Sequence, residues 1–185
     1  MGPHISIRTP HICLPAMTTP TSRHGSYERL MAAGRSHPER VDQALLRSQR
    51  SADLAILTCM DTRIVVEDIF ELRTGDAIVL RNAGAVATDD VLRSLILAQQ
   101  LLGTGEVIVV GHSGCGLSRL AEDALRRSLE GQTGASSEIA FGSFADVDGH
   151  VQRQVELIRD HPWIKPVGVH GLVYEVETGA VREVG

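Results

Sequence analysis

The chain has 185 residues, of which 43% are hydrophobic and 22% charged, as expected for one folded domain with a hydrophobic core. Its net charge of -5 and the lack of a Lys/Arg-rich run give no reason to expect nucleic acid as a partner. The longest apolar stretch, near residues 94–102, is interrupted by Gln99 and Gln100 and is too short to span a bilayer. We therefore expect neither a transmembrane helix nor a membrane partner.

Residues 1–35 are expected to form an irregular N-terminal arm, because prolines recur there among polar residues without periodicity. The N-terminus also lacks a continuous apolar segment and a small-residue cleavage site, so we expect no signal peptide and a cytoplasmic protein. Three cysteines in such a chain favour metal binding or catalysis over a disulfide scaffold. Cys13 lies in the arm and is expected to be a thiol without a role.

Residues 36–185 are expected to form a single domain in which strands and helices alternate. The segment "PERVDQALLRSQR" from Pro38 to Arg50 predicts an N-terminal helix. Helices are also expected over 65–72, over 91–102 after Thr88, from about Cys115, and over 148–160. Short apolar strands are expected at 54–57, 76–80 and 107–110, with a loop over 131–145 and a final strand pair turning at 177–180. This order predicts an α/β fold, with a mainly parallel central sheet flanked by helices.

Two of the predicted strands end in residues that can bind a metal ion. Cys59 follows the strand "LAIL" after one intervening residue, Thr58. His112 and Cys115 follow the strand "VIVV". Ligands bind at the carboxyl ends of parallel strands, so these three side chains converge if the two strands are neighbours. Two thiolates and one imidazole form a zinc ligand set that leaves a fourth position for water or substrate. Taken singly, either cysteine is equally typical of a buried core residue.

The stretch "GHSGC" also invites comparison with the nucleophile elbow of an α/β-hydrolase. That motif is Gly-x-Ser-x-Gly, and here Gly111 and Ser113 fit, but Cys115 occupies the position of the second glycine. The acid and histidine of a hydrolase would also have to follow Ser113, in less chain than that fold normally needs. We therefore interpret Ser113 as a residue that hydrogen-bonds locally.

Three motifs in this order resemble the β-class carbonic anhydrases, most closely their small prokaryotic branch. They are Cys-x-Asp-x-Arg at 59–63, Arg-Asn-Ala-Gly at 81–84 and His-x-x-Cys-Gly at 112–116. The resemblance implies one zinc ion per chain, bound by Cys59, His112 and Cys115. It implies that Asp61 and Arg63 form the catalytic dyad. It further implies a homodimer or a dimer of dimers, in which the predicted N-terminal helix crosses onto the partner.

The activity that this resemblance implies is the reversible hydration of CO2 to bicarbonate and a proton, by a zinc lyase. Zinc lowers the pKa of its bound water to about 7, and the resulting zinc-bound hydroxide attacks CO2. Asp61 would accept a hydrogen bond from this hydroxide, and Arg63 would hold Asp61 ionised and oriented. Ala83, Gly84 and Val86 are expected to form a small apolar wall for the substrate.

Two other functions remain open at this point. The same fold and zinc set also serve hydrolases of COS and CS2, and a non-catalytic zinc protein would need the ligands but not the pair of Asp61 and Arg63. That pair, seen outside the motif, is equally typical of a structural ion pair. His150, His161 and His170 lack partners at ligand spacing, so we interpret them as surface or hydrogen-bonded core histidines.

Overall fold

The structure is a computed structural model, and it describes residues 26–39, 41, 52–165 and 168–185. The chain divides into two compact units, Met1–Gln43 and Ala44–Gly185. In the first unit, helix α1 covers Ser26–Ser36 and a short 3-10 helix, η2, follows at His37–Glu39. Of the helix predicted over 38–50, residue 40 and residues 42–51 lie outside the described residues.

Helix α1 corrects the expectation of irregular structure as far as residue 35. The sequence "SYERLMAAGRS" is rich in strong helix formers, with Glu28 in the first turn and Arg35 in the last. An acid near the N-terminus and a base near the C-terminus of a helix both interact favourably with its dipole. The prediction of an irregular arm rested on the prolines upstream of this segment, and those prolines do not prevent a helix that begins after them.

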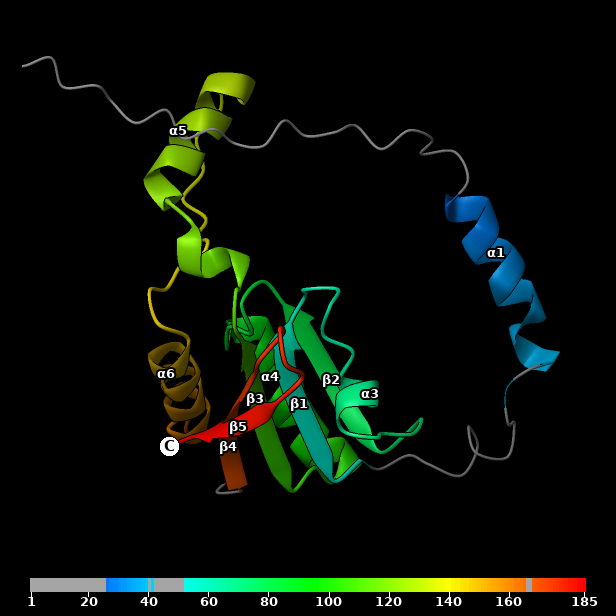
Figure 1. The fold of residues 1–185 in the computed structure, drawn as a ribbon. Helices are drawn as coiled ribbons and strands as arrows, with labels where there is room; N and C mark the ends of the chain where they lie inside the picture. The colour runs from blue at the N-terminus through cyan, green and yellow to red at the C-terminus, as the bar shows by residue number, and fades with distance from the viewer. Residues whose placement is uncertain (1–25, 40, 42–51, 166–167) are drawn as a thin grey trace, which may run out of the picture. The chain divides into compact units, whose positions relative to one another are not determined.

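A five-stranded sheet forms the centre of the second unit (Figure 1). Its strand order is β2-β1-β3-β4-β5; the first four strands are mutually parallel and β5 runs antiparallel to β4. The mainly parallel sheet predicted from the sequence is therefore confirmed. The strands are β1 Leu54–Cys59, β2 Ala77–Asn82, β3 Glu106–His112, β4 Gly168–Tyr174 and β5 Val181–Val184.

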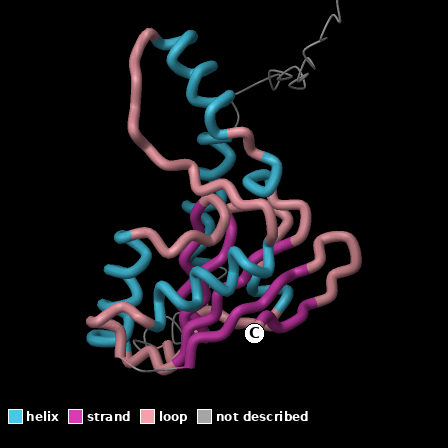
Figure 2. Tube along the Cα trace, turned by 90° about the vertical axis from the view of Figure 1, so that its left-hand side faces the viewer, coloured by secondary structure: helices cyan, strands magenta, loops and turns pink. Residues whose placement is uncertain are grey.

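Helices cover both faces of this sheet, so that β1 is buried on both sides. On one face, helices α4 (Asp89–Leu97) and α6 (Val147–Arg159) pack on a core that includes Ala55 and Leu57. On the other face, the single-turn helix α3 (Val66–Ile69) belongs to a core that includes Ile56. Successive side chains of a strand point to opposite faces, which explains the alternation. Figure 2 shows the strands side by side with helices beside them.

Several helices differ in length from the sequence prediction. Helix α3 ends early, and Glu71 beyond it has a left-handed φ of 53°. Helix α4 begins after Thr88 as predicted and runs on as a π-helical turn, η3 (Ala98–Leu102), before Gly103. The chain after Cys115 forms the short 3-10 helix η4 (Gly116–Arg119) and then helix α5 (Glu122–Thr133). Helix α5 extends three residues into the loop predicted over 131–145. Within the described part of the chain, every helix is too short or too polar to traverse a bilayer.

Helix α6 approaches the sheet closely because glycines lie beneath it. A Cβ atom at Gly111 in β3 would lie 2.5 Å from a methyl carbon of Val151, and one at Gly171 in β4 would lie 2.8 Å from the other. Such separations are too short for carbon atoms, so any side chain at these positions would push the helix away from the sheet. The two glycines therefore set the spacing between α6 and strands β3 and β4.

We expect the substitution Gly171→Ala to lower the free energy of unfolding by about 1–3 kcal/mol, as overpacking of a filled core does. The matched control is Gly131→Ala on the exposed side of α5, where a Cβ would meet no atom within 4 Å. The control should unfold at the same or a slightly higher urea concentration. Equal loss in both variants, or no loss at position 171, would contradict the role given to Gly171.

Candidate metal centre

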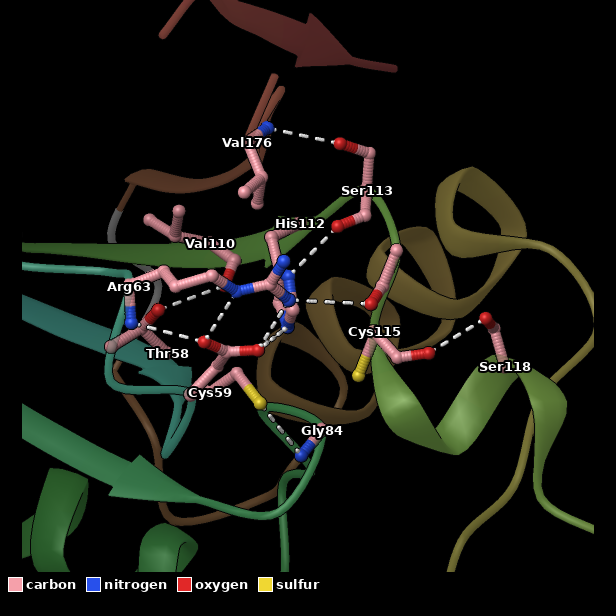
Figure 3. A network of polar contacts seen from close by, with 12 residues as sticks. Thr58, Cys59, Arg63, Gly84, Val110, His112, Ser113, Cys115, Ser118 and Val176 are labelled. Carbon is pink, nitrogen blue, oxygen red and sulfur yellow. Dashed lines mark hydrogen bonds and ion pairs between the residues drawn. The ribbon is translucent and has the colours of Figure 1, made fainter. Parts of the chain in front are cut away.

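The pairing of β1 with β3 brings the predicted metal ligands together. The two strands are in parallel register from Leu54 opposite Glu106 to Thr58 opposite Val110, so Cys59 and His112 end them at the same sheet edge. Cys115 follows on the next turn (Figure 3). One ligand atom from each of Cys59, His112 and Cys115 lies within 4.8 Å of the others, and all three residues are buried. The predicted convergence is confirmed.

The ring of His112 is oriented to offer one nitrogen to a metal ion. Its Nδ1 lies 3.0 Å from the carbonyl oxygen of Ser113. A carbonyl oxygen only accepts, so the proton of the neutral ring belongs on Nδ1 and the lone pair on Nε2. That Nε2 is buried and has no hydrogen-bond partner among the described residues. A buried polar atom left in this state is costly unless a ligand satisfies it, so the donor set fits a metal ion.

The two cysteines have different electrostatic surroundings. Burial raises the pKa of the Cys59 thiol, but His112 and the backbone N–H groups of Asp61 and Gly84 outweigh burial and lower it to about 7. The Gly84 N–H lies 3.4 Å from Cys59 Sγ. Burial raises the pKa of the Cys115 thiol, and the nearby Cys59 raises it further. A divalent cation would stabilise both thiolates together, and zinc suits such soft donors.

Asp61 and Arg63 form a two-pronged ion pair beside the cluster. Arg63 Nη2 lies 2.7 Å from Asp61 Oδ2, and Arg63 Nε lies 2.9 Å from Oδ1. These hydrogen bonds hold the pKa of the Asp61 carboxyl well below its usual range. Oδ2 also lies 3.9 Å from His112 Nε2, so the carboxylate borders the metal cluster. The main chain here is braced by Arg81, which donates to the carbonyl oxygens of Cys59 and Asp61 at 3.2 and 2.7 Å.

A mostly apolar cavity of about 620 Å³ opens onto Cys59, Asp61 and Cys115. Ala83 and Gly84 line it, as the sequence predicted. Val86 is not among the residues that line it, and its N–H and carbonyl are both hydrogen-bonded to the side-chain amide of Asn82. No motif predicted the other large apolar residues of the lining that come from the segments after β3: Leu117, Leu120, Leu125 and Phe141.

Ser113 is not placed as a nucleophile. Its hydroxyl oxygen accepts a hydrogen bond of 3.0 Å from the N–H of Val176, in the turn between β4 and β5 (Figure 3). This bond links the end of β3 to the last two strands. The local role predicted for Ser113 is confirmed.

A parallel sheet whose strand ends carry a buried Cys-His-Cys cluster beside an Asp–Arg pair has the ligand set typical of a zinc protein. Comparison with known proteins agrees: the family model described as "Carbonic anhydrase" matches residues 54–181. The chain therefore belongs to the carbonic anhydrase family, in its β class.

Individual relatives support this assignment. Beta-carbonic anhydrase 1 of Mycobacterium tuberculosis is 37% identical over 135 residues, which are 72% of this chain and 83% of that protein. The crystal structure of carbonic anhydrase from Streptococcus mutans superimposes with a TM-score of 0.78 at 31% identity, covering 86% of this chain and 97% of that one. A carbon disulfide hydrolase of Acidithiobacillus thiooxidans is 35% identical over 150 residues, which are 70% of this chain and 75% of that protein.

We expect Cys59→Ser to lose most of its bound zinc, because a serine hydroxyl is a poor substitute for a thiolate ligand. The matched control is Cys13→Ser, which changes the one cysteine outside the cluster. Zinc per chain is measured by elemental analysis after gel filtration of each protein. Near-stoichiometric zinc in Cys59→Ser would remove this residue from the ligand set.

Proposed function

We propose that the protein is a zinc-dependent carbonic anhydrase that interconverts CO2 and bicarbonate, with Cys59, His112 and Cys115 holding one zinc ion per chain. The observation that carries the proposal is the pairing of Asp61 with Arg63 beside a buried ligand cluster, in which His112 Nε2 has no hydrogen-bond partner within the described part of the chain. A site that only stabilised the fold would need the three ligands but no such pair. Family membership supports the same reaction.

Zinc bound by three protein ligands lowers the pKa of a water molecule at its fourth position to about 7, which provides a nucleophile at neutral pH. Asp61 is the residue that orients it. Since its pKa is far below neutrality, the carboxylate accepts a hydrogen bond rather than donating one. Arg63 donates to both carboxylate oxygens and would fix their direction beside the metal that Cys59, His112 and Cys115 would hold.

The apolar cavity wall favours the binding of a nonpolar substrate and the release of a charged product. Ala83 and Gly84 leave room next to Cys59 and Cys115, and Leu117 and other apolar side chains complete the wall. CO2 carries no charge and is compatible with this wall, whereas bicarbonate must give up hydration to stay there. The same lining therefore favours entry of the substrate and release of the product.

Hydrolysis of CS2 or COS is the second candidate function. It is favoured by the 35% identity to a carbon disulfide hydrolase and by the apolar cavity, because CS2 is also a small linear molecule without charge. Initial rates with CO2, COS and CS2 on one zinc-loaded sample distinguish the candidates. Faster turnover of CS2 than of CO2 would replace the carbonic anhydrase assignment.

We further infer a cytoplasmic enzyme that assembles as a homodimer or a dimer of dimers. Helix α1 supports assembly, because Tyr27, Leu30 and Met31 recur at helical spacing and form an apolar stripe along it. An apolar stripe of this kind needs a partner surface. Light scattering on the full chain measures the oligomeric state, and a monomer would contradict the inference.

Replacing Asp61 by Ala should lower CO2 hydration by about a hundredfold or more, the typical effect of removing a group that stabilises the transition state. Zinc should remain bound, since Asp61 is not among the three ligands. Stopped-flow CO2 hydration and zinc content are measured on the same sample. Unchanged turnover would remove Asp61 from the mechanism, and loss of zinc would make it a ligand instead.

The rate of CO2 hydration at low substrate should rise with pH between 6.5 and 9, because the nucleophile forms as water loses a proton with a pKa of about 7. Asp61 should add no inflection in this range. Its lowered pKa keeps it ionised throughout, and its contribution is lost only in strong acid. The stopped-flow profile tests this sign, and a rate that falls as pH rises would contradict it.

A further inference from the structure

The loop after β2, residues 83–87, carries a hydrogen-bond donor to the metal cluster in an unusual backbone conformation. Gly84 has a φ of 81° and Ala85 a φ of 57°, so two successive residues are left-handed. In this conformation the Gly84 N–H points at Cys59 Sγ (Figure 3). Such a conformation in a non-glycine residue such as Ala85 is strained and persists only when the surrounding structure enforces it.

Helix α6 supplies two side chains that hold this loop from outside. The Nε2 of His150 lies 2.7 Å from the Gly84 carbonyl oxygen, and the Oε1 of Gln154 accepts the N–H of Ala87 at 2.9 Å. The two residues are four positions apart and therefore lie on one face of α6. They are only 4% and 6% exposed, so both bonds are shielded from water.

His150 is itself fixed in position. The Gly84 carbonyl only accepts, so Nε2 donates, and burial lowers the pKa of His150, which favours the neutral ring with its proton on Nε2. The ring stacks on Phe144, with centroids 4.0 Å apart and planes 15° apart. Phe144 packs in the same core as Cys59 and Cys115. His150 therefore lies on helix α6, stacks on the core that contains Cys59 and Cys115, and hydrogen-bonds to the loop beside the cluster.

We propose that His150, together with Gln154, is a positioning residue for the metal site, which fixes Gly84 so that its N–H is aimed at the Cys59 thiolate. Glycine occupies left-handed and right-handed regions with similar ease, so the conformation of Gly84 is not self-sustaining. Without His150, the buried Gly84 carbonyl would lack its donor, and the loop would rearrange to satisfy it. The inference rests on the proposed function, in which Cys59 is a zinc ligand.

The consequence concerns the zinc ion that the cluster is proposed to hold. An N–H donor to a coordinating thiolate stabilises its charge and limits its donation to the metal, and partners of this kind change metal affinity by about 10- to 100-fold. The loop also presents Ala83 and Gly84 to the cavity, so its displacement would alter the substrate wall as well. A residue that only filled the core would do neither.

A matched pair of substitutions tests the donor. His150→Gln places an amide nitrogen the same number of bonds from Cα as Nε2, whereas His150→Met has the same length without a donor. We expect the Met variant to bind zinc about tenfold more weakly in competition with a chelator, and the Gln variant to bind nearly as the wild type does. In the Co2+-substituted proteins, the sulfur-to-metal charge-transfer band should shift in the Met variant and be restored in the Gln variant.

Val155→Ala is the control for general loosening of α6, since Val155 packs toward Gly171 of β4 and its side chain cannot hydrogen-bond to the loop. It should lower stability and leave zinc affinity unchanged. Wild-type zinc affinity and spectrum in a folded His150→Met variant would overturn the proposal. If that variant does not fold, Gln154→Met is measured in the same way, and unchanged zinc affinity there would also overturn it.

These outcomes are separable from failure of the proposed function. A wild-type protein that binds no zinc, or binds zinc without hydrating CO2, would contradict the carbonic anhydrase assignment. The comparison of His150 variants uses zinc affinity and the cobalt spectrum, which do not depend on CO2. A wild-type enzyme with full activity beside an unaffected Met variant would overturn the role of His150 alone.

Discussion

The parallel pairing of β1 with β3 is the constraint on which the site depends. Thr58 lies opposite Val110, and Thr58 Oγ1 also donates to the Val110 carbonyl at 3.1 Å, which reinforces the register just before both strands end. A shift by one residue would displace Cys59 relative to His112 along the sheet edge by about 3.3 Å and reverse which face each side chain of the shifted strand points to. Both faces of β1 are buried, so such a shift would also disturb two cores. The packing that stabilises the sheet therefore also fixes the separation of the ligands.

Each negatively charged group of the site has its own source of positive charge. Cys59 and Cys115 lie together in a buried place where only a cation can keep both ionised, while the Asp61 carboxylate is already neutralised by Arg63. Arg81 donates only to main-chain carbonyls and leaves the thiolates to the metal. Under the proposed function, this division would leave the carboxylate free to act as an oriented hydrogen-bond acceptor, which is what a hydrating site needs.

The sequence predicted those features that depend on local pattern. Short runs of β-branched residues gave the strands, and the spacing of His112 and Cys115 gave two ligands on one turn. Features that depend on contacts between distant segments were not predicted from the sequence, or were predicted only in part. The cavity wall at Leu117 and Phe141 is one example. His150 is another: the sequence leaves open a surface or a hydrogen-bonded core histidine, the structure shows the second, and its partner lies 66 residues away where no spacing rule connects them.

Helix α6 shows why such distant contacts bear on function. Its Val151 rests against the bare backbone of Gly111 in β3, one residue before His112, and His150 beside it holds the loop that faces Cys59. One helix therefore reaches the surroundings of ligands from two different strands, without contributing a ligand of its own. Because close-packed cores transmit displacement rather than absorb it, a shift of α6 would reach both strand ends at once. The geometry of the metal centre is thus a property of the helix layer as much as of the ligand motifs.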